Sequence, residues 1–348
     1  MRELKIRQNE AGQRLDKFLK KYLKEAPGSF IYKMLRKKNI VLNGKKADGS
    51  EKLTVGDCVK LFLAEDTIQK FSGEVKTVGS EAQHLLKENK NARIPVIYED
   101  SNVLFLNKPS GMLSQKAKPT DFSVNEYVIS YLLNSGQIHE EELRTFRPAV
   151  CNRLDRNTSG IIAAGKTLSG LQELSRLFKE RGMEKYYLCI VKGTIKNPAY
   201  IKGFLQRDLN THKVTVVKEI EDKDDFLPIE TEYFPIAYHH EITLLRVHLI
   251  TGRSHQIRAH LASIGHPVLG DYKYGDRAFN EPFRKKYEIK DQLLHAYELK
   301  IPKQDGALKE ISEKTFTAEI PDDFWRVIKE TTWEHGIQEA LEVPHSKI

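Results

Sequence analysis

The start of the chain alternates between helical and extended patterns of apolar side chains. Apolar residues recur at helical spacing over 14–24, which predicts an amphipathic helix. A second helix is predicted over about 29–38, with Ser29 as its N-cap. Short extended runs then flank the dipeptide Asn43-Gly44, which is a strong turn signal because both residues tolerate positive φ. The pattern is that of a compact unit of two helices and small strands.

Two less regular segments flank a long central span. Residues 66–93 have a mixed, polar composition and are expected to form a linker with one short helix near 81–89. Residues 322–348 have the pattern of a peripheral helical tail. The sequence therefore predicts a small α/β unit over 1–65 and a larger domain over 94–321, and a chain of 348 residues is long enough for both.

Extended patterns dominate the larger domain. Strands are expected at 96–98, 103–106, 160–165, 185–192 and 242–250. The first two flank a short turn and predict a hairpin, and a helix that Thr167 caps follows the third. Because strands outnumber helices, we expect an α+β fold built on a mixed, mainly antiparallel sheet with flanking helices.

The positive charge is concentrated at the start of the chain. The whole sequence has 56 Lys and Arg against 48 Asp and Glu, a net charge of +8. Residues 1–63 hold 16 basic and 7 acidic residues, a net charge of +9, which leaves 40 basic and 41 acidic residues elsewhere. Such a segment is either a solubilising surface or a module that binds a polyanion by displacing counterions from phosphates.

The cysteines and the apolar runs exclude two broad classes of protein. Cys58, Cys151 and Cys189 are scattered and odd in number, so no disulfide framework is expected. No run approaches the roughly 20 apolar residues that span a bilayer. The first residues lack the apolar core of a signal peptide. We therefore expect a cytoplasmic protein with no membrane association.

Candidate chemistry is concentrated in three segments. In RPAVCNRLDRNTSG, Asp155 stands between Arg153 and Arg156, and in isolation this arrangement favours a structural ion pair. Tyr187 lies on an extended segment where an aromatic residue is usually part of the core. His255 and Arg258 are three residues apart on a predicted helix and are expected to project from one side of it.

Several familiar enzyme sites are absent from the sequence. His255, His260 and His266 lack the spacing and the glutamate of a zinc-binding HExxH helix, which disfavours a metal-dependent hydrolase. There is no GxSxG elbow of a serine hydrolase and no glycine-rich phosphate-binding loop. We expect neither a metal nor a small-molecule cofactor.

Four stretches together resemble the RluA-type family of pseudouridine synthases. They are "NKPSGM" at 107–112, "NRLDRNTSG" at 152–160, "KYYLCIVKG" at 185–193 and "TGRSHQIRAHLASIGHPVLGDYKYG" at 251–275. The resemblance covers about residues 95–300. In the first unit, "RLDKFL", "IVLNGKK" and "VGDCVKLFL" resemble the S4-type RNA-binding domain. The chain departs from many members of the family at Asn152, where they have histidine.

The resemblance implies roles for three residues. Asp155 would act at the ribose of a flipped uridine, either as a nucleophile at C1′ or as a base that removes a ribose proton. Arg258 would keep this carboxylate ionised in a bidentate pair. Tyr187 would pack on the uracil and act as a base or relay when the C5 proton leaves, with Ile257 as the apolar wall. The reaction is a redox-neutral isomerisation and requires no cofactor.

The resemblance also implies a set of RNA contacts. Arg153 would fill the space that the flipped uridine vacates. The other expected contacts in the larger domain are Lys108, Arg156, Arg253 and His255. Those in the S4-like unit are Arg14, Lys33, Arg36, Lys37, Asn43 and Lys45.

The expected substrate is large-subunit (23S) ribosomal RNA or a pre-ribosomal particle, with the protein as a monomer. Two other interpretations remain. One is an enzyme that modifies tRNA, which the S4-like unit disfavours only by analogy. The other is a non-catalytic RNA-binding protein of ribosome assembly, which should have lost Asp155, Tyr187 or Arg258, yet all three are present.

Overall fold

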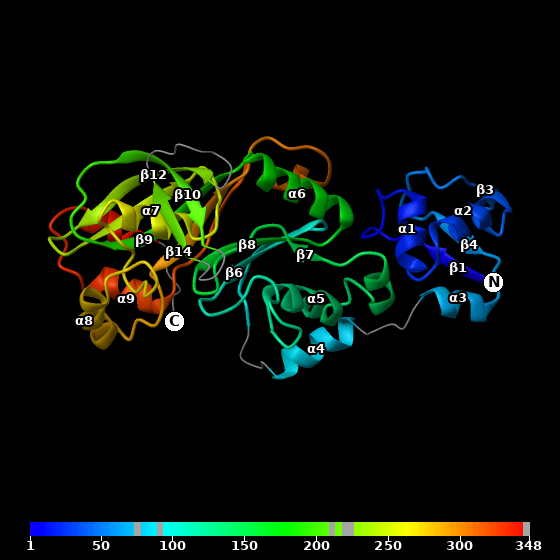
Figure 1. The fold of residues 1–348 in the computed structure, drawn as a ribbon, viewed down its shortest axis with the longest axis horizontal. Helices are drawn as coiled ribbons and strands as arrows, with labels where there is room; N and C mark the ends of the chain where they lie inside the picture. The colour runs from blue at the N-terminus through cyan, green and yellow to red at the C-terminus, as the bar shows by residue number, and fades with distance from the viewer. Residues whose placement is uncertain (73–77, 89–92, 209–212, 218–225, 344–348) are drawn as a thin grey trace.

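The protein has a small N-terminal module and a long sheet domain. The computed structural model describes residues 1–72, 78–88, 93–208, 213–217 and 226–343. The N-terminal module, residues 1–72, lies at one end of the molecule, and the sheet domain extends from it to the other end (Figure 1). No helix within these ranges is both long enough and apolar enough to cross a membrane.

The N-terminal module packs two helices on a four-stranded antiparallel sheet. Its elements are β1 (Arg2–Lys5), α1 (Leu15–Tyr22), α2 (Gly28–Arg36), β2 (Ile40–Leu42), β3 (Lys45–Lys46) and β4 (Cys58–Leu61), with strand order β1-β4-β2-β3. Both predicted helices are confirmed, and apolar residues of each are buried in one core. Ser29 is not the N-cap, because α2 begins one residue earlier and Pro27 takes that position.

The predicted linker contains two helices. Residues Glu65–Ser72 form α3, whose Ile68 is buried in the core of the N-terminal module. Residues Val78–Glu88 form α4, which packs through Ala82 against the sheet domain. The expectation of a single helix was wrong, because only Ile68 and Phe71 mark the apolar side of α3 and the pattern is too short to recognise. Residues 73–77 and 89–92 lie outside the described ranges.

A large sheet forms the centre of the second domain. Its strands are β5 (Val96–Glu99), β6 (Val103–Lys108), β7 (Ala149–Val150), β8 (Ser159–Gly165), β9 (Glu184–Lys192), β10 (Ala199–Arg207), β11 (Val214–Val217), β12 (Phe226–Tyr238), β13 (Ile242–Leu249), β14 (Leu294–Lys300) and β15 (Thr315–Thr317). The order is β11-β10-β12-β13-β9-β14-β8-β6-β5, with β15 beside β14 and β7 beside β8. All these pairs are antiparallel except β14 with β8. The predicted α+β, mainly antiparallel fold is confirmed.

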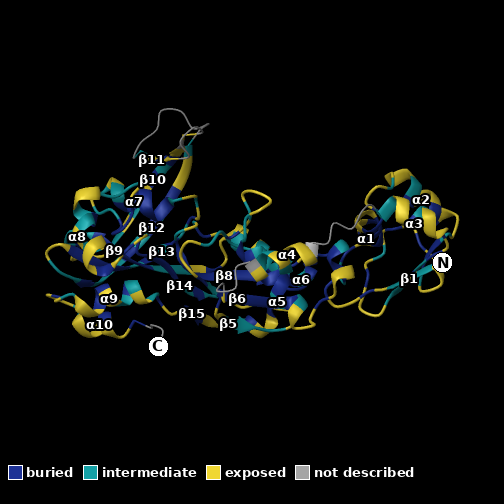
Figure 2. Ribbon diagram, turned by 90° about the horizontal axis from the view of Figure 1, so that it is seen from below, coloured by how far each residue is buried: buried dark blue, intermediate teal, exposed yellow. Residues whose placement is uncertain are grey.

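Helices cover both faces of this sheet. They are α5 (Val124–Asn134), the 3-10 helix η1 (Glu140–Arg144), α6 (Leu168–Glu180), α7 (Gln256–Ser263), α8 (Arg277–Tyr287), the 3-10 helix η2 (Gly306–Ile311), α9 (Asp322–Glu330) and α10 (Ile337–Leu341). Across β6 and β8, α6 lies on one face and α4 and α5 on the other (Figure 1). Across β9 and β13, α7 covers one face and α8 to α10 the other. The enclosed strands are consequently buried, as Figure 2 shows for β6 and β8.

The C-terminal segment is part of the domain core. It is helical as expected, but it is not peripheral. Phe324, Val327, Ile328 and Trp333 are buried with Leu188 of β9 in one apolar cluster. The side chains of α9 recur at i, i+3 and i+4, and this stripe faces the sheet. Removing this segment would expose the underlying core.

A polar contact joins the N-terminal module to the sheet domain. The side chains of Arg7 and Asn9 both donate to the carboxylate of Glu142 in η1. Nearby, the hydroxyl of Thr145 donates to the carboxylate of Glu10. Glu142, Asn9 and Glu10 are buried, so the contact has little access to solvent. It sets the position of the basic module relative to the sheet.

The two halves of the large sheet meet where β8 runs parallel to β14. Ala296 of β14 lies opposite Gly160 of β8. Gly160 has φ +108, and a Cβ atom there would lie 2.2 Å from the carbonyl oxygen of Ala296. Only glycine permits this backbone and this approach. The loop that precedes Gly160 carries Asp155, so the junction positions the candidate site.

Candidate active site

A cavity of about 790 Å³ opens beside the junction of the two half-sheets. The loop before β8, the start of β9 and the segment that leads into α7 supply its walls. Asp155, Tyr187, Arg253, His255, Ile257 and Arg258 all line it. These residues come from three segments that are far apart in the sequence, and the fold brings them together.

Asp155 and Arg258 form a direct ion pair in this cavity. Nη1 of Arg258 donates to Oδ2 of Asp155 at 2.8 Å. The Asp155 side chain is 25 % exposed, whereas that of Arg258 is 9 % exposed. The carboxylate therefore keeps one side open to the cavity while a largely buried guanidinium holds the other. The predicted pairing of these residues is present, but it uses one N–H group and is not bidentate.

The bidentate partner of Arg258 is Asp271. Nε and Nη2 of Arg258 donate to the two carboxylate oxygens of Asp271 at 2.7 and 3.0 Å. The backbone N–H groups of Lys273 and Tyr274 donate to the same carboxylate. Asp271 is 0 % exposed. Its four hydrogen bonds fix the guanidinium plane, and the remaining Nη1 is thereby aimed at Asp155.

Burial and charge shift the pKa values of Arg258 and Asp271 in opposite directions. Burial would lower the pKa of Arg258, but hydrogen bonds and charge from Asp271 and Asp155 raise it above its ordinary value. Burial would raise the pKa of Asp271, but the Arg258 guanidinium holds it below its ordinary value. Both groups are therefore charged at neutral pH.

His255 forms a second contact on Asp155. Its Nδ1 lies 2.8 Å from the hydroxyl oxygen of Tyr274, and its Nε2 lies 3.9 Å from Oδ2 of Asp155. His255 precedes α7 with φ 55, a left-handed conformation that is uncommon for histidine. Burial lowers the pKa of His255 more than the charge of Asp155 raises it, so the neutral imidazole is favoured. His255 precedes the helix instead of lying in it, but it and Arg258 both face Oδ2 of Asp155.

Tyr187 and Ile257 supply apolar surface to the cavity. Burial, and then the charge of Asp155, raise the pKa of Tyr187. The phenol is therefore protonated at neutral pH. Ile257 is buried beside the ring in the cluster that α7 forms with the sheet. Both residues line the cavity that holds Asp155.

Comparisons with known proteins agree with this arrangement. The RNA pseudouridylate synthase family model matches residues 102–263. The ribosomal large subunit pseudouridine synthase C of Vibrio vulnificus (strain CMCP6) is 34 % identical over 298 residues, which cover 84 % of this chain and 85 % of that protein. The protein of the same name from Salmonella typhimurium (strain LT2) is 34 % identical over 308 residues, covering 85 % and 86 %. The chain belongs to the RNA pseudouridylate synthase family.

The chain is thus an enzyme that isomerises uridine in RNA to pseudouridine. Its fold is shared with the solved structure of human RNA pseudouridylate synthase domain containing 4. The TM-score is 0.56 at 20 % identity, covering 74 % of this chain and 98 % of that one.

Lys108, which the sequence suggested as an RNA contact, is buried and makes its hydrogen bonds within the protein. Its side chain is 0 % exposed, and Nζ donates to the carbonyl oxygens of Pro109, Met112 and Arg156 at 2.9, 2.8 and 2.9 Å. Burial lowers the pKa of Lys108 to about 7, although the charges of Asp155 and Asp291 oppose the shift. The ammonium group ties the loop after β6 to the loop that carries Asp155.

Replacing Lys108 with methionine is expected to destabilise the protein without changing the salt dependence of RNA binding. Three buried carbonyl groups would lose their donor, and we expect the free energy of unfolding to fall by about 2–4 kcal/mol. Denaturant unfolding of Lys108→Met and of the exposed control Lys118→Met measures this. If the salt dependence of RNA binding changed in Lys108→Met and not in Lys118→Met, Lys108 would contact a phosphate after all.

Asn152 is a structural residue of the same loop. Its Oδ1 accepts the backbone N–H of Ala163 at 2.8 Å, and its Nδ2 donates to the carbonyl of Ile161 at 3.2 Å. The amide thus fastens the start of the Asp155 loop to β8. An amide can make both of these bonds, so the departure from histidine leaves the site geometry intact.

The three arginines expected to contact RNA lie at or near the cavity. Arg153 and Arg156 are exposed, and Nε of Arg156 donates to the carbonyl of Gly111 at 3.0 Å. Arg253 is half-buried, and its Nε is buried without a hydrogen-bond partner among the described residues. A donor that is left unpaired in a cavity wall is suited to an anionic ligand.

The other histidines considered for a metal site are separated in the fold. Nδ1 of His260 lies 3.0 Å from the hydroxyl of Thr231, and Nδ1 of His266 lies 2.8 Å from the carbonyl of Lys192. Across the described residues, they do not form a ligand group with His255.

Sequence reasoning missed Asp271 and Tyr274, which orient Arg258 and His255. Both lie in the motif "GDYKYG", but nothing in that motif names their partners. The available signal was an acidic residue two positions after the apolar pair Val268-Leu269, since a carboxylate at the edge of a core is seldom unpaired.

Proposed function

We propose that this enzyme acts on large-subunit ribosomal RNA and that Asp155 is its catalytic residue. The carrying observation is the open carboxylate of Asp155, held by a buried guanidinium that Asp271 fixes. The substrate follows from the relatives, because both of those described above are named ribosomal large subunit pseudouridine synthase C.

The reaction breaks the C1′–N1 bond of uridine, turns the uracil, and joins C1′ to C5. Asp155 either attacks C1′ or removes a ribose proton, and both routes need the carboxylate ionised and open to the cavity. Arg258 stabilises that charge without covering it. The carboxylate becomes free again when the new C1′–C5 bond has formed, so no group is consumed.

The remaining steps need a wall for the uracil and an acceptor for the C5 proton. Tyr187 and Ile257 provide the wall, and the protonated phenol of Tyr187 can donate a hydrogen bond to the base. The proton that leaves C5 can pass to Asp155 or to the neutral imidazole of His255, which Tyr274 orients, and N1 of the uracil takes up one proton to become the N–H of the product. In this proposal His255 is a proton acceptor in the reaction, and it is not assigned to binding a phosphate.

Arginines at the cavity would hold the RNA around the flipped uridine. Flipping costs a few kcal/mol of stacking and pairing, which contacts elsewhere must offset. The exposed Arg153 is suited to fill the vacated space, and Arg156 to hold the backbone beside it. The unpaired Nε of Arg253 is suited to a phosphate oxygen within the cavity.

The N-terminal module would supply further affinity as an S4-type RNA-binding domain. Arg14, Lys33, Arg36, Lys37 and Lys45 are all exposed on it. Asn43 is exposed as well, but Asp57 and the backbone of Cys58 already occupy its amide. We assign Asn43 to shaping the turn, and the five basic residues to phosphates.

Neutralising three of these basic residues should flatten the salt dependence of RNA binding. In Lys33→Gln/Arg36→Gln/Lys37→Gln, the slope of log K against log salt should fall by about 2–3, because each phosphate contact contributes roughly 0.7–0.9. Fluorescence anisotropy with a ribosomal RNA fragment measures this. The control Lys303→Gln/Lys309→Gln/Lys329→Gln carries the same charge change elsewhere, and equal slopes in both triple variants would contradict the proposal.

Mapping pseudouridines in cellular RNA with and without the gene tests the function directly. We expect specific pseudouridines of large-subunit ribosomal RNA to disappear with the gene and to return with the intact gene but not with Asp155→Asn. Loss confined to tRNA would establish the alternative substrate. An unchanged map would contradict the proposed activity in the cell.

The proposal places the enzyme where ribosomes are assembled, in the cytoplasm. The same proposal has the enzyme act as a monomer.

A further inference from the structure

Two histidines and a glutamate meet at the end of the sheet opposite the active site. His239 and His240 lie in the turn between β12 and β13, and Glu334 lies between α9 and α10. The active-site segment follows the other end of β13. Because β13 has 8 residues, the two ends of this strand are roughly 25 Å apart.

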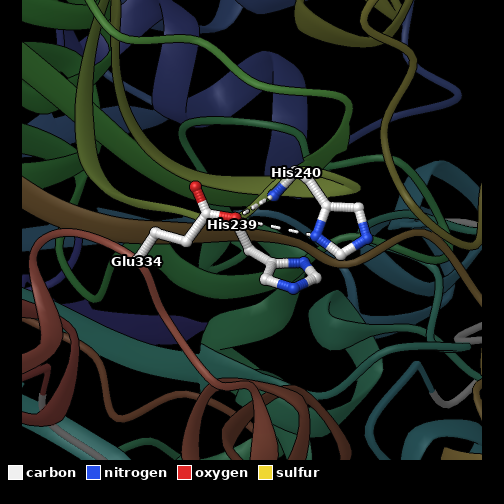
Figure 3. Close-up of side chains that lie close together, drawn as sticks. All are labelled: His239, His240 and Glu334. Atoms are coloured by element: carbon white, nitrogen blue, oxygen red, sulfur yellow. Dashed lines mark hydrogen bonds and ion pairs between the residues drawn. The ribbon is translucent and has the colours of Figure 1, made fainter.

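The three side chains converge on one point at the surface. One ligand atom from each lies within 4.8 Å of the ligand atoms of the other two. Figure 3 shows the Glu334 carboxylate directed at His240, with the His239 ring beside them. The two imidazole rings have centroids 3.8 Å apart, and Nδ1 of His240 lies 3.6 Å from Oε1 of Glu334.

Hydrogen bonds fix the backbone of both segments that carry these side chains. Tyr238 N–H donates to the His335 carbonyl at 3.2 Å, and Glu334 N–H donates to the Tyr238 carbonyl at 3.0 Å. The Thr194 hydroxyl lies 3.1 and 3.3 Å from the carbonyl oxygens of His239 and His240. Only side-chain rotations are therefore needed to bring the three groups to one ion.

We propose that His239, His240 and Glu334 bind one divalent transition-metal ion, with zinc as the reference ion. Two imidazoles and a carboxylate are a common ligand set for Zn²⁺, at about 2.0–2.2 Å from each donor atom, and water completes the tetrahedron. Imidazole donors disfavour Mg²⁺ and Ca²⁺, which prefer oxygen. This proposal departs from the sequence-based expectation of no metal, which had considered only His255, His260 and His266.

The bound ion would connect the C-terminal segment to the sheet. Glu334 follows the buried Trp333, and α9 and α10 on either side cover the core beneath β9 and β13. Without an ion, the side chain of Glu334 contacts only His240 among the described residues, through its Nδ1 and its backbone N–H, and such an exposed pair contributes little. The metal thus makes this end of β12 and β13 more resistant to unfolding and leaves the distant cavity unchanged.

Titration of the full-length, chelator-treated protein with zinc chloride tests the site. We expect one equivalent of Zn²⁺ to bind by calorimetry at pH 7.5, and the affinity to fall at least tenfold in His240→Ala/Glu334→Gln. His139→Ala, which removes an exposed histidine elsewhere, should bind as the parent does. No stoichiometric binding, or equal binding in the double variant, would overturn the proposal.

Thermal unfolding provides a second measurement that does not depend on activity. With Zn²⁺ at about one hundred times its dissociation constant, the melting temperature of the parent should rise by about 4 °C, and that of the double variant should not. Pseudouridine formation should be the same with zinc and with chelator. A metal that bound without shifting the melting temperature would contradict the proposed connection.

Discussion

Asp155→Asn is expected to abolish pseudouridine formation while RNA binding persists. The amide has the shape of the carboxylate and can still accept the N–H of Arg258, but it can neither attack C1′ nor take a ribose proton. We expect the single-turnover rate to fall by about 10⁴-fold or more. Arg258 keeps its bidentate partner Asp271 in this variant, so the folded structure should be retained.

The measurement pairs single-turnover kinetics with RNA affinity. Asp155→Asn should bind the same ribosomal RNA fragment within a few-fold of the parent, because the phosphate contacts are unchanged. Asp305→Asn, which changes an exposed aspartate away from the cavity, should retain the parental rate. A residual rate within tenfold of the parent in Asp155→Asn would refute the catalytic assignment.

The sequence located Asp155, Tyr187 and Arg258 because each stands in a long, specific motif. It also located β9, which carries Tyr187, and β13, which leads into the segment of Arg258, because both are extended runs rich in apolar residues. Asp155 pairs with Arg258 as expected, but through one N–H group instead of two. Which oxygen meets which nitrogen depends on Asp271, and no local pattern encodes a contact between two loops.

Lys108 is a residue whose burial the sequence did not predict. A lysine beside proline and glycine in a loop is usually exposed, and a basic residue in an RNA-modifying enzyme suggests a phosphate contact. In the structure Lys108 ends β6, and the loop that follows covers its side chain. Three carbonyl oxygens surround Nζ. The signal for burial is tertiary, because Arg156 lies 48 positions away in the chain.

The tail and the linker were misjudged for a related reason. The apolar positions of α9 predict a helix with one buried side, but they do not say which surface covers that side. Only the sheet shows that Phe324 and Trp333 complete the core under β9. In the same way, Ile68 looks like a single apolar residue until the core of the N-terminal module surrounds it.

Asp271→Asn should impair both stability and catalysis, because it removes the group that orients Arg258. The substitution leaves a buried guanidinium short of a counter-charge and places an NH₂ group against its donors. We expect the free energy of unfolding to fall by about 3–5 kcal/mol. We also expect kcat to fall by about 10²-fold, because Nη1 of Arg258 is then free to leave Asp155. Asp276→Asn, which changes the half-buried aspartate that caps α8 nearby, should retain kcat.

Replacing the pair with apolar residues separates the two effects. Breaking a buried pair leaves an uncompensated charge, whereas removing both charges does not. Asp271→Leu/Arg258→Met should therefore be less destabilised than the sum of its single variants by at least about 2 kcal/mol, while its kcat stays as low as that of Arg258→Met. Recovery of kcat together with stability would mean that Asp271 and Arg258 serve only the fold. Recovery of stability alone would assign them to positioning the charge of Asp155.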